Sequence, residues 1–402
     1  MTTMTKANVQ SFIHTLIPAY QPIIGSDHFE VIGFELLGRY KDTHHEIQSL
    51  GPIFNNPSIS PIQKQLIDEE IRNLGIEAFY QSMLWKQNKQ FFININPDYV
   101  TGRFHHRLLR KLTQLSNRGA DLSAVVLEIT EQSSSLHHQA FMDQIRDYRN
   151  LGAQIAIDDV GKGFSSLDRI AHIEPDLLKI DLKLVQKSTH SKSYQHVLHA
   201  LSILAQRMGS DLLFEGIETT DELEAAWNYG AMFYQGFLFY QASPDFRIEI
   251  PFSELMQRKR RHMIDTLTDK LKKRVIFERS LNHTFSLTSK PAFDCFAKPD
   301  QVVEHFLPCL NNMCLRVYLC DHYGNQISSN YLRQNEKWSI HPEFKGKNWS
   351  SRPYFLKNLV EMDIQQAGHL SDSYLDVQTG NELFTFSYPV ANGLYLFADF
   401  QA

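Results

Sequence analysis

The chain has 402 residues, of which 43% are hydrophobic and 21% charged, and its formal net charge at pH 7 is -5. This length favours two domains, or one large barrel with an appended domain, and the composition is ordinary for a soluble globular protein. A slightly acidic chain has no overall attraction to nucleic acid or to an anionic membrane, so we expect neither as a partner, and a phosphate-bearing ligand would need local cations or metal ions.

No stretch of the sequence predicts a signal peptide or a membrane span. Residues 1–25 lack an apolar core of sufficient length, and no later run approaches the roughly 20 apolar residues of a spanning helix. We therefore expect a cytoplasmic protein.

Cysteines and paired histidines carry no chemical signature of their own. Cys295, Cys309, Cys314 and Cys320 lack the paired short spacings of a zinc site, which predicts free thiols. The adjacent histidine pairs at 44/45, 105/106 and 137/138 diverge on any regular element, so we expect them on the solvated surface.

The first 250 residues repeat one pattern, a short apolar run followed by a segment of helical character. In chain order the runs are IPAYQPII, FEVIGFELL, QFFININ, SAVVLEIT, AQIAIDDV, DLLKID, DLLFEGI and FYQGFLF. Runs this apolar suit strands buried on both faces, and helices between them suit parallel crossovers. Eight such units predict an α/β fold, a TIM-type (β/α)8 barrel over residues 1–250.

Polar residues recur at or near the C-terminal end of these runs. They are Glu35, Asn94, Glu128, Asp158, Asp159, Lys179, Asp181, Glu215 and Gln235. In a barrel these ends gather around one mouth, where the catalytic groups of this fold lie. Any one acid is readily explained as a turn or a helix cap, but so many at one rim are harder to explain that way. Clustered carboxylates repel one another unless cations lie between them, and carboxylate and amide oxygens select magnesium, manganese or calcium.

A set of short motifs spans about residues 15–245. They are YQPI (20–23), ELLGR (35–39), ININ (93–96), LEITE (127–131), DDVGKGFSSL (158–167), LLKID (177–181), EGIET (215–219) and QG (235–236). In this order and spacing they resemble the EAL-domain phosphodiesterases, which hydrolyse the bacterial second messenger cyclic di-GMP. No diguanylate cyclase signature is present in the sequence, so synthesis of the messenger is not indicated.

The resemblance, carried over residue by residue, implies a site for two metal ions. The implied metal ligands are Glu35, Asn94, Glu128, Asp158, Asp159 and Glu215. Magnesium or manganese is the implied cofactor, with calcium inhibitory. A pair of ions would neutralise the phosphodiester and activate a water molecule.

Further roles follow from the same resemblance. Lys179 would hold or deprotonate the attacking water, Glu215 would complete the metal and water shell, and Glu131 would anchor the loop after Asp159. The implied substrate-binding residues are Gln21, Arg39, Asp181, Glu218 and Gln235.

Two departures from the family pattern stand out. Leu36 replaces the usual alanine of the signature triplet and leaves Glu35 intact. Lys162 replaces a small hydroxyl residue beside the second metal position, where a cation would weaken binding of that ion or pair with phosphate. Two hypotheses therefore stay open, hydrolysis of cyclic di-GMP to the linear dinucleotide pGpG, and binding of cyclic di-GMP with little or no turnover.

Residues 251–289 predict a connecting helix. Met256, Met263, Leu267 and Leu271 recur at helical spacing in a strongly basic segment. A solvated helix between two domains is the favoured interpretation, and a nucleic-acid or membrane role for its cations is the alternative. The helix is also a candidate to carry motion or homodimer contacts between the domains. The apolar seam is too short to predict a coiled coil.

Residues 290–402 predict a small α+β domain with an antiparallel sheet. CLRVYLC (314–320), LFTFSYPV (383–390) and LYLFADF (394–400) have the composition of strands. NWSSRPYF (348–355) and SDSYLDVQTG (371–380) resemble PAS-like or Cache-type sensor domains, and an EAL barrel with such a module resembles the YkuI-type proteins. The residues implied to line a pocket for an unknown small ligand are Trp349, Arg352, Tyr354, Tyr374 and Asp376, although core and turn roles explain them equally well.

Overall fold

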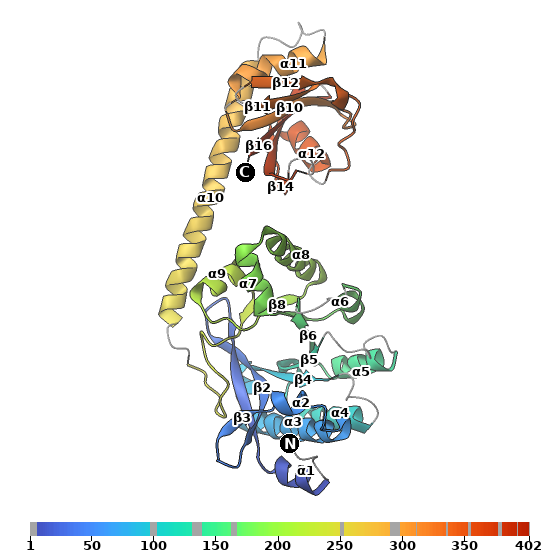
Figure 1. Ribbon diagram of the computed structural model, residues 1–402, viewed down its shortest axis with the longest axis vertical. Coiled ribbons are helices and arrows are strands. Elements are labelled where there is room, and N and C mark those ends of the chain that lie inside the picture. Colours follow the sequence, from blue (N-terminus) through green and yellow to red (C-terminus); the bar gives the residue numbers. More distant parts are fainter. Residues whose placement is uncertain are drawn as a thin grey trace. The chain divides into compact units, whose positions relative to one another are not determined.

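The computed structural model in Figure 1 describes residues 6–96, 103–130, 139–161, 167–249, 253–289, 298–310, 312–334, 337–352, 355–376, 380–391 and 393–401. Six residues singled out in the sequence lie outside these ranges, namely Glu131, His137, His138, Lys162, Cys295 and Tyr354. Contacts divide the chain into two compact units, Met1–Met263 and Ile264–Ala402. Among the described helices, none has the length and apolar character needed to cross a membrane.

The first unit is a closed barrel of eight strands. The order β1-β9-β8-β7-β6-β5-β4-β2 closes because β1 also pairs with β2, and β3 (Ile47–Ser49) extends the sheet beyond β2. The barrel strands are β1 (Leu16–Gly25), β2 (Val31–Lys41), β4 (Gln90–Ile95), β5 (Val125–Thr130), β6 (Gln154–Val160), β7 (Leu177–Ile180), β8 (Asp211–Phe214) and β9 (Phe233–Tyr234). Each coincides with one of the eight predicted apolar runs, so the predicted TIM-type barrel is confirmed.

One strand departs from the repeated parallel unit. β1 runs antiparallel to both β2 and β9, whereas the neighbouring pairs from β2 through β9 are parallel. Only residues 26–30 separate β1 from β2, and a parallel crossover needs about a dozen residues. The prediction of parallel crossovers throughout is therefore wrong at β1, and the hairpin register places Gln21 opposite Glu35.

Helices surround the barrel and cover the outward faces of its strands (Figure 1). They are α1 (Lys6–Ile13), α2 (Gly51–Phe54), α3 (Pro61–Ser82), α4 (Arg103–Asn117), α5 (Gln139–Asn150), α6 (Leu167–Ile173), α7 (Leu182–His190), α8 (Lys192–Met208) and α9 (Thr220–Asn228), with 3₁₀ turns η1 (Leu84–Gln87) and η2 (Leu122–Ala124). The sequence sets several of these boundaries. Capping boxes begin α3 at Ser60 and α9 at Thr219, and Gly209, at φ 71°, ends α8.

Alternating strand residues divide the core of the barrel into two layers. Ile93, Leu127 and Ile155 belong to the large outer cluster that packs beneath the helices. A small inner cluster is formed by Ile23, Phe92, Val126, Ala156, Leu177 and Leu213. Neighbouring residues on a strand face opposite sides, so this inner cluster is the floor of the barrel interior.

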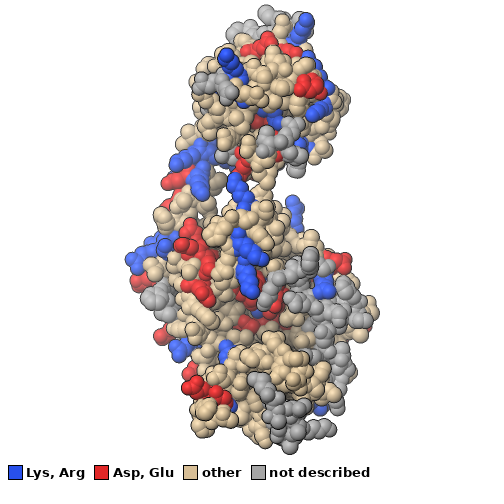
Figure 2. All heavy atoms as spheres, in the orientation of Figure 1, with Lys and Arg blue, Asp and Glu red and all other residues tan. Residues whose placement is uncertain are grey.

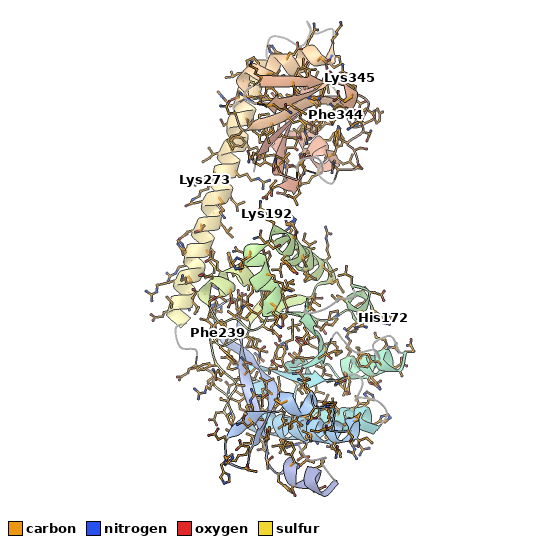
Figure 3. All side chains as sticks on the ribbon, viewed as in Figure 1. His172, Lys192, Phe239, Lys273, Phe344 and Lys345 are labelled. Carbon is orange, nitrogen blue, oxygen red and sulfur yellow. The ribbon has the colours of Figure 1, made fainter. Side chains whose placement is uncertain are left out.

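The helix α10 (Ser253–Ser289) follows the barrel strands, where the sequence predicts a connecting helix. Its surface carries many exposed cations, among them Lys272 and Lys273, and Figure 3 labels Lys273 on this helix. On the face drawn in Figure 2, Lys and Arg side chains are interspersed with Asp and Glu.

The second unit is the predicted small α+β domain. Its antiparallel sheet has the order β12-β11-β10-β16-β15-β13, and β14 also pairs with β15. The strands are β10 (Cys314–Asp321), β11 (Asn330–Gln334), β12 (Lys337–His341), β13 (His369–Leu370), β14 (Tyr374–Leu375), β15 (Glu382–Ala391) and β16 (Leu394–Gln401), with α11 (Pro299–Phe306), η5 (Leu307–Cys309), η6 (Pro342–Phe344) and α12 (Phe355–Gln365). Leu281 and Phe285 of α10 join one apolar cluster of this unit, and Phe355 and Leu359 of α12 join another.

Two minor predictions have different outcomes. Cys309, Cys314 and Cys320 are free thiols, as predicted. His105 is buried at 4% exposure, with its Nδ1 3.0 Å from the Tyr148 hydroxyl and its Nε2 3.2 Å from Asp147, so the predicted surface location is wrong. The packing of α4 against α5 encloses this ring, and a pair of adjacent histidines contains no signal for that packing.

Candidate active site

The polar site lies one layer above the floor of the barrel interior. Asn94, Glu128, Asp158, Lys179 and Glu215 each follow a floor residue by two positions, and Gln21 precedes Ile23 by two in the antiparallel strand. Residues two apart on a strand point to the same side. The spacing therefore directs all of these side chains into the barrel, at the C-terminal ends of its parallel strands.

Lys179 of β7 is the centre of this layer. Its side chain is fully buried, and its Nζ lies 2.5 Å from both Glu128 Oε1 and Glu215 Oε1. Asp158 Oδ1 is 3.5 Å away and Glu35 Oε2 is 3.8 Å away. A buried ammonium group needs opposite charge nearby, and here four carboxylates from four different strands provide it.

The carboxylates and the lysine shift one another's pKa values. Burial alone would lower the pKa of Lys179, but Asp158, Glu128, Glu215 and Glu35 together raise it well above its ordinary value. Burial, followed by repulsion from Glu35, raises the pKa of Glu128 well above its ordinary value despite Lys179. Burial and then Asp158 raise the pKa of Glu215 to about 8. The site therefore holds more negative charge than one lysine stabilises.

Two amide side chains fix Glu35 of β2. Asn94 donates from Nδ2 to Glu35 Oε1 at 2.8 Å, and Gln235 donates from Nε2 to Glu35 Oε2 at 2.6 Å. The next residue after Gln235 must be glycine, because a Cβ on Gly236 would lie 2.0 Å from the carbonyl oxygen of Ile217. This close backbone approach explains the QG pair in the sequence.

Asp158 and Asp159 turn toward one site because β6 is irregular there. The pairing of β6 with β7 shifts register between Ile157 and Val160, and Asp159 has φ 62°, in the left-handed region. The Asp159 backbone N–H donates to Asp158 Oδ1 at 2.7 Å. Asp158, Asp159 and Glu215 consequently offer three oxygens that lie within 4.8 Å of one another.

The donor atoms of this site fit a hard divalent cation. The expected metal ligands, Glu35, Asn94, Glu128, Asp158, Asp159 and Glu215, offer carboxylate and amide oxygens, which magnesium, manganese and calcium prefer. Glu128 Oε2 and Gln235 Oε1 are buried and accept no hydrogen bond from the described residues. A bound cation would supply the partner that Glu128 lacks and would reduce the repulsion among the carboxylates.

A cavity of about 230 Å³ opens at this layer. Three of the expected substrate-binding residues, Gln21, Glu218 and Gln235, line it together with Glu35, Asp158 and Glu215. Glu222, the capping residue of α9, holds the loop that carries Glu218 by accepting from its backbone N–H at 2.9 Å.

Sequence reasoning missed one aromatic wall of this cavity. Leu37 and Phe237 also line it, and Phe237 is 59% exposed. An exposed aromatic ring beside a polar cavity offers a flat surface on which a planar ligand group can stack. Its place directly after the QG pair is the signal that identifies it.

Two expected substrate-binding residues do not line the cavity. Arg39 is half-buried on β2 and donates from Nη1 to the Gly38 carbonyl at 3.0 Å. Asp181 is the N-cap of α7, where its Oδ1 accepts from the Lys183 backbone N–H at 2.8 Å. Their contacts with substrate stay predictions.

The expected sensor pocket of the second unit is only partly assembled. Arg352 and Tyr374 line one cavity there, but Trp349 and Asp376 do not. Trp349 donates from Nε1 to Gln326 at 3.0 Å, and Asp376 is buried in an ion pair with Arg316 at 3.2 Å. These two side chains have the core role that the sequence left open as the alternative.

Family comparisons divide the chain at nearly the same place as its contacts. Residues 8–244 match the EAL domain, and residues 250–402 match the EAL-domain associated signalling protein domain. The first match includes every expected metal ligand.

Individual relatives resemble either the whole chain or its first unit. The chain is 33% identical over 391 residues to the uncharacterized EAL-domain containing protein YkuI of Bacillus subtilis (strain 168), covering 96% of this chain and 94% of that protein. The crystal structure of B. subtilis YkuI in complex with substrate c-di-GMP and calcium matches with a TM-score of 0.89 and 31% identity over 98% of both chains. The probable cyclic di-GMP phosphodiesterase PdeB of Escherichia coli (strain K12) is 28% identical over 56% of this chain and 42% of its own length.

Proposed function

The chain belongs to the EAL domain family, and from that premise we propose that it hydrolyses cyclic di-GMP to the linear dinucleotide pGpG in a metal-dependent reaction. The supporting observation is Lys179, buried among four carboxylates at the mouth of the barrel, with an open cavity beside it. Two relatives support this proposal, since PdeB is a probable cyclic di-GMP phosphodiesterase and the YkuI structure holds c-di-GMP with calcium.

Six residues would hold the metal ions, namely Glu35, Asn94, Glu128, Asp158, Asp159 and Glu215. Magnesium or manganese suits their oxygen donors, and two bound ions would neutralise the phosphodiester and lower the pKa of a bound water. Gln235 and Asn94 keep Glu35 in one orientation through their hydrogen bonds at 2.6 and 2.8 Å. Holding Glu35 in this orientation would lower the ordering cost of metal binding.

Lys179 and Glu215 are the protein groups that would act on the attacking water. Their contact at 2.5 Å places the buried ammonium group of Lys179 against a carboxylate that lines the cavity. In this role Lys179 orients the water as an ammonium group, or accepts its proton as a neutral amine if bound metal ions lower its pKa, and Glu215 fixes the position of its Nζ. Phe237 offers its exposed ring to a guanine base, since base-to-aromatic stacking suits a planar ligand.

The organisation of the chain supports a division of labour. We assign catalysis to residues 1–250, the connection to residues 251–289, and sensing or homodimer contacts to residues 290–402. Cytoplasmic cyclic di-GMP is the substrate in this proposal.

The proposal is tested by incubating the pure full-length protein with cyclic di-GMP and magnesium or manganese and separating the products by chromatography. We expect pGpG to accumulate, and we expect a chelator to stop the reaction. Lys179→Ala should abolish product formation, whereas Lys187→Ala, which removes an exposed lysine of α7, should leave the rate within about twofold. Tight binding of cyclic di-GMP without product over hours would overturn the enzyme proposal in favour of a binding protein.

A further inference from the structure

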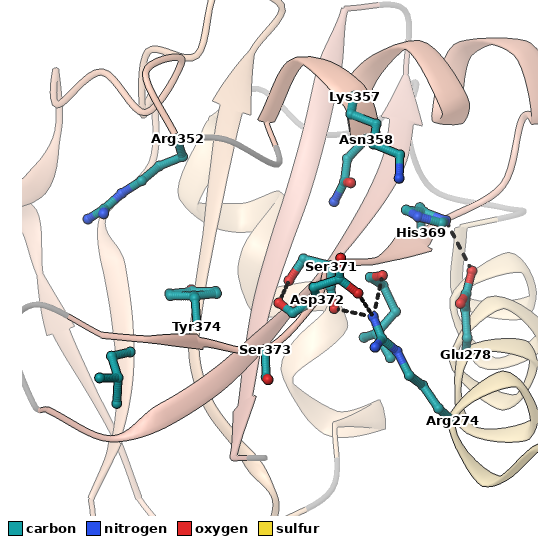
Figure 4. A pocket seen from close by; sticks show the side chains of 12 residues that line it. Arg274, Glu278, Arg352, Lys357, Asn358, His369, Ser371, Asp372, Ser373 and Tyr374 are labelled. Atoms are coloured by element: carbon teal, nitrogen blue, oxygen red, sulfur yellow. Dashed lines mark hydrogen bonds and ion pairs between the residues drawn. The ribbon is translucent and has the colours of Figure 1, made fainter. Parts of the chain in front are cut away.

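The second unit contains a cavity of about 590 Å³ that is separate from the barrel site. Its walls come from α10, α12 and the strand segment 369–375, all within this unit (Figure 4). This volume lies in the range of about 300–1,000 Å³ that is usual for small-molecule sites. We propose that this cavity binds a small organic anion through a carboxylate or phosphate group held by Arg352.

Among the described residues, the ion pairs around the cavity leave Arg352 without a carboxylate partner. Arg274 of α10 pairs with Asp372 at 3.0 Å and donates to the Ser371 carbonyl at 2.7 Å. His369 lies between Glu278 at 3.3 Å and Glu361 at 2.9 Å. Asp372 is therefore already paired with Arg274, and Glu278 lies beside the His369 ring.

Arg352 and Lys357 are the remaining lining cations, and of the two only Lys357 has a described carboxylate within ion-pair distance. The Arg352 guanidinium lies 5.5 Å from the centroid of the Trp349 ring and forms no ion pair with a described carboxylate. Lys357 is 68% exposed, and its Nζ is 3.9 Å from Glu361, which also contacts His369. A guanidinium with no carboxylate partner in a concave site favours an anionic group.

A buried amide adds a directional contact. Asn358 of α12 is only 2% exposed and lines the cavity, and Figure 4 shows it pointing from the helix toward the strand segment. Its Nδ2 donates to the Ser387 hydroxyl at 3.2 Å, and no described residue donates to its Oδ1. An acceptor left open in this way adds a contact for a ligand that carries a hydroxyl or amino group, which glycerol 3-phosphate has and succinate lacks.

Tyr374 closes one side of the cavity and is held rigidly. Its hydroxyl lies 2.8 Å from Thr385 Oγ1, which donates to Asp399 at 2.7 Å. The ring therefore supplies a fixed apolar wall while its polar end is satisfied by the domain itself. A rigid wall of this kind lowers the ordering cost of binding.

Calorimetric titration of the full-length protein tests the anionic preference. The probes are succinate, glycerol 3-phosphate and succinamide, the last being a neutral analogue of succinate. We expect one or both anions to bind at concentrations up to roughly 10 mM, and succinamide to bind at least about tenfold more weakly. Binding of succinate alone identifies a carboxylate ligand, and binding of glycerol 3-phosphate alone identifies a phosphate ligand.

Substitutions then locate the site. Arg352→Gln should lower the affinity for the anion by about 10- to 100-fold. Lys357→Gln, at a largely exposed position whose charge Glu361 partly offsets, should lower that affinity less and should not affect folding. Lys337→Gln removes the same charge from an exposed position outside the cavity and should leave affinity unchanged. Equal binding of succinate and succinamide, unchanged affinity in Arg352→Gln, or no binding of either anion would overturn the proposal. None of these measurements depends on cyclic di-GMP hydrolysis.

Discussion

The barrel and the second unit both bury charged side chains, but the two differ in how completely they supply hydrogen-bond and ion-pair partners for them. In the barrel, four carboxylates surround Lys179 within 3.8 Å. In the second unit, Arg316 pairs with Asp399 at 2.5 Å and with Asp376 at 3.2 Å, and Thr385 donates to the other Asp399 oxygen at 2.7 Å. Both oxygens of Asp399 thus have protein donors, whereas Glu128 Oε2 accepts no hydrogen bond from the described residues.

This difference separates a structural network from a functional one. A buried polar network that satisfies its own members stabilises one conformation of the domain. A cluster with excess charge and a missing partner is stable only because the surrounding fold forces it together, and such clusters gather at functional sites. The barrel cluster should therefore be replaceable without loss of fold, and the network around Arg316 should not.

Glu128→Gln provides the largest expected effect. The substitution keeps the shape of the side chain but removes one expected metal ligand, so the rate of cyclic di-GMP hydrolysis should fall by about a thousandfold or more. With a chelator present, its Tm should be unchanged or higher, because a neutral amide ends the repulsion from Glu35.

Glu46→Gln is the matched control for that experiment, since Glu46 is exposed in the same unit. It should change neither the rate nor the Tm. A large loss of stability in the chelated Glu128→Gln protein would show that the barrel cluster has a structural role, like the network around Arg316.

Arg316→Met, unlike Glu128→Gln, should destabilise the unit that contains it. Removing the guanidinium leaves the buried carboxylate of Asp399 without its main partner, and breaking one side of a buried pair costs about 3–5 kcal/mol. The free energy of unfolding of the second unit, measured by hydrogen exchange in β10 and β16, should fall by this amount. Arg279→Met, at an exposed position of α10, should change it by less than about 0.5 kcal/mol.

The sequence contains most of the information that builds the barrel site. Asn94, Glu128, Asp158, Lys179 and Glu215 share the spacing of two from an apolar floor residue, so alternation alone places them in one layer. Because the alternation has a period of two residues, it places these side chains on one face even when the predicted strand ends are wrong by a few residues. That is why the layer could be predicted before the fold was known.

Other features depend on tertiary packing and left no such signal. The antiparallel direction of β1 follows from the short connection at residues 26–30, and the positive φ of Asp159 follows from the register shift in β6. In the second unit, the stretches that carry Trp349 and Asp376 resemble a pocket motif, yet both side chains are engaged inside the domain. The local sequence shows which polar groups are present, but it does not show which hydrogen-bond or ion-pair partner each group has in the fold.

The pH dependence of the stability of the chelated protein tests whether the barrel carboxylates destabilise one another. Burial and then Asp158 raise the pKa of Glu215 from 4.5 to about 8, so this group stabilises the fold fully below about pH 4.5, and that contribution is lost as the pH rises toward about 8. Hydrogen exchange in β7 and β8 should therefore show a less stable barrel at about pH 8 than at about pH 5.

Glu215→Gln is the control for this experiment, because it removes the titrating group and should flatten the slope. Saturating magnesium should flatten it as well, since bound cations stabilise the charged carboxylates. A chelated wild-type barrel with the same stability at both pH values would show that the carboxylates are not strained by one another.

Substitution of Asp181 should have the smallest effect on stability. It tests, within the barrel, whether a carboxylate has a structural or a functional role. This carboxylate caps α7 through the Lys183 backbone N–H, a structural contact, although the family resemblance gives it a substrate role. Asp181→Ala should lower the free energy of unfolding by about 1 kcal/mol, and Asp181→Asn, which can still accept at the N-cap, should lower it by only a few tenths. If Asp181→Asn keeps both stability and the KM for cyclic di-GMP, the residue acts as a cap; a rise in KM at unchanged stability would place it with the functional carboxylates.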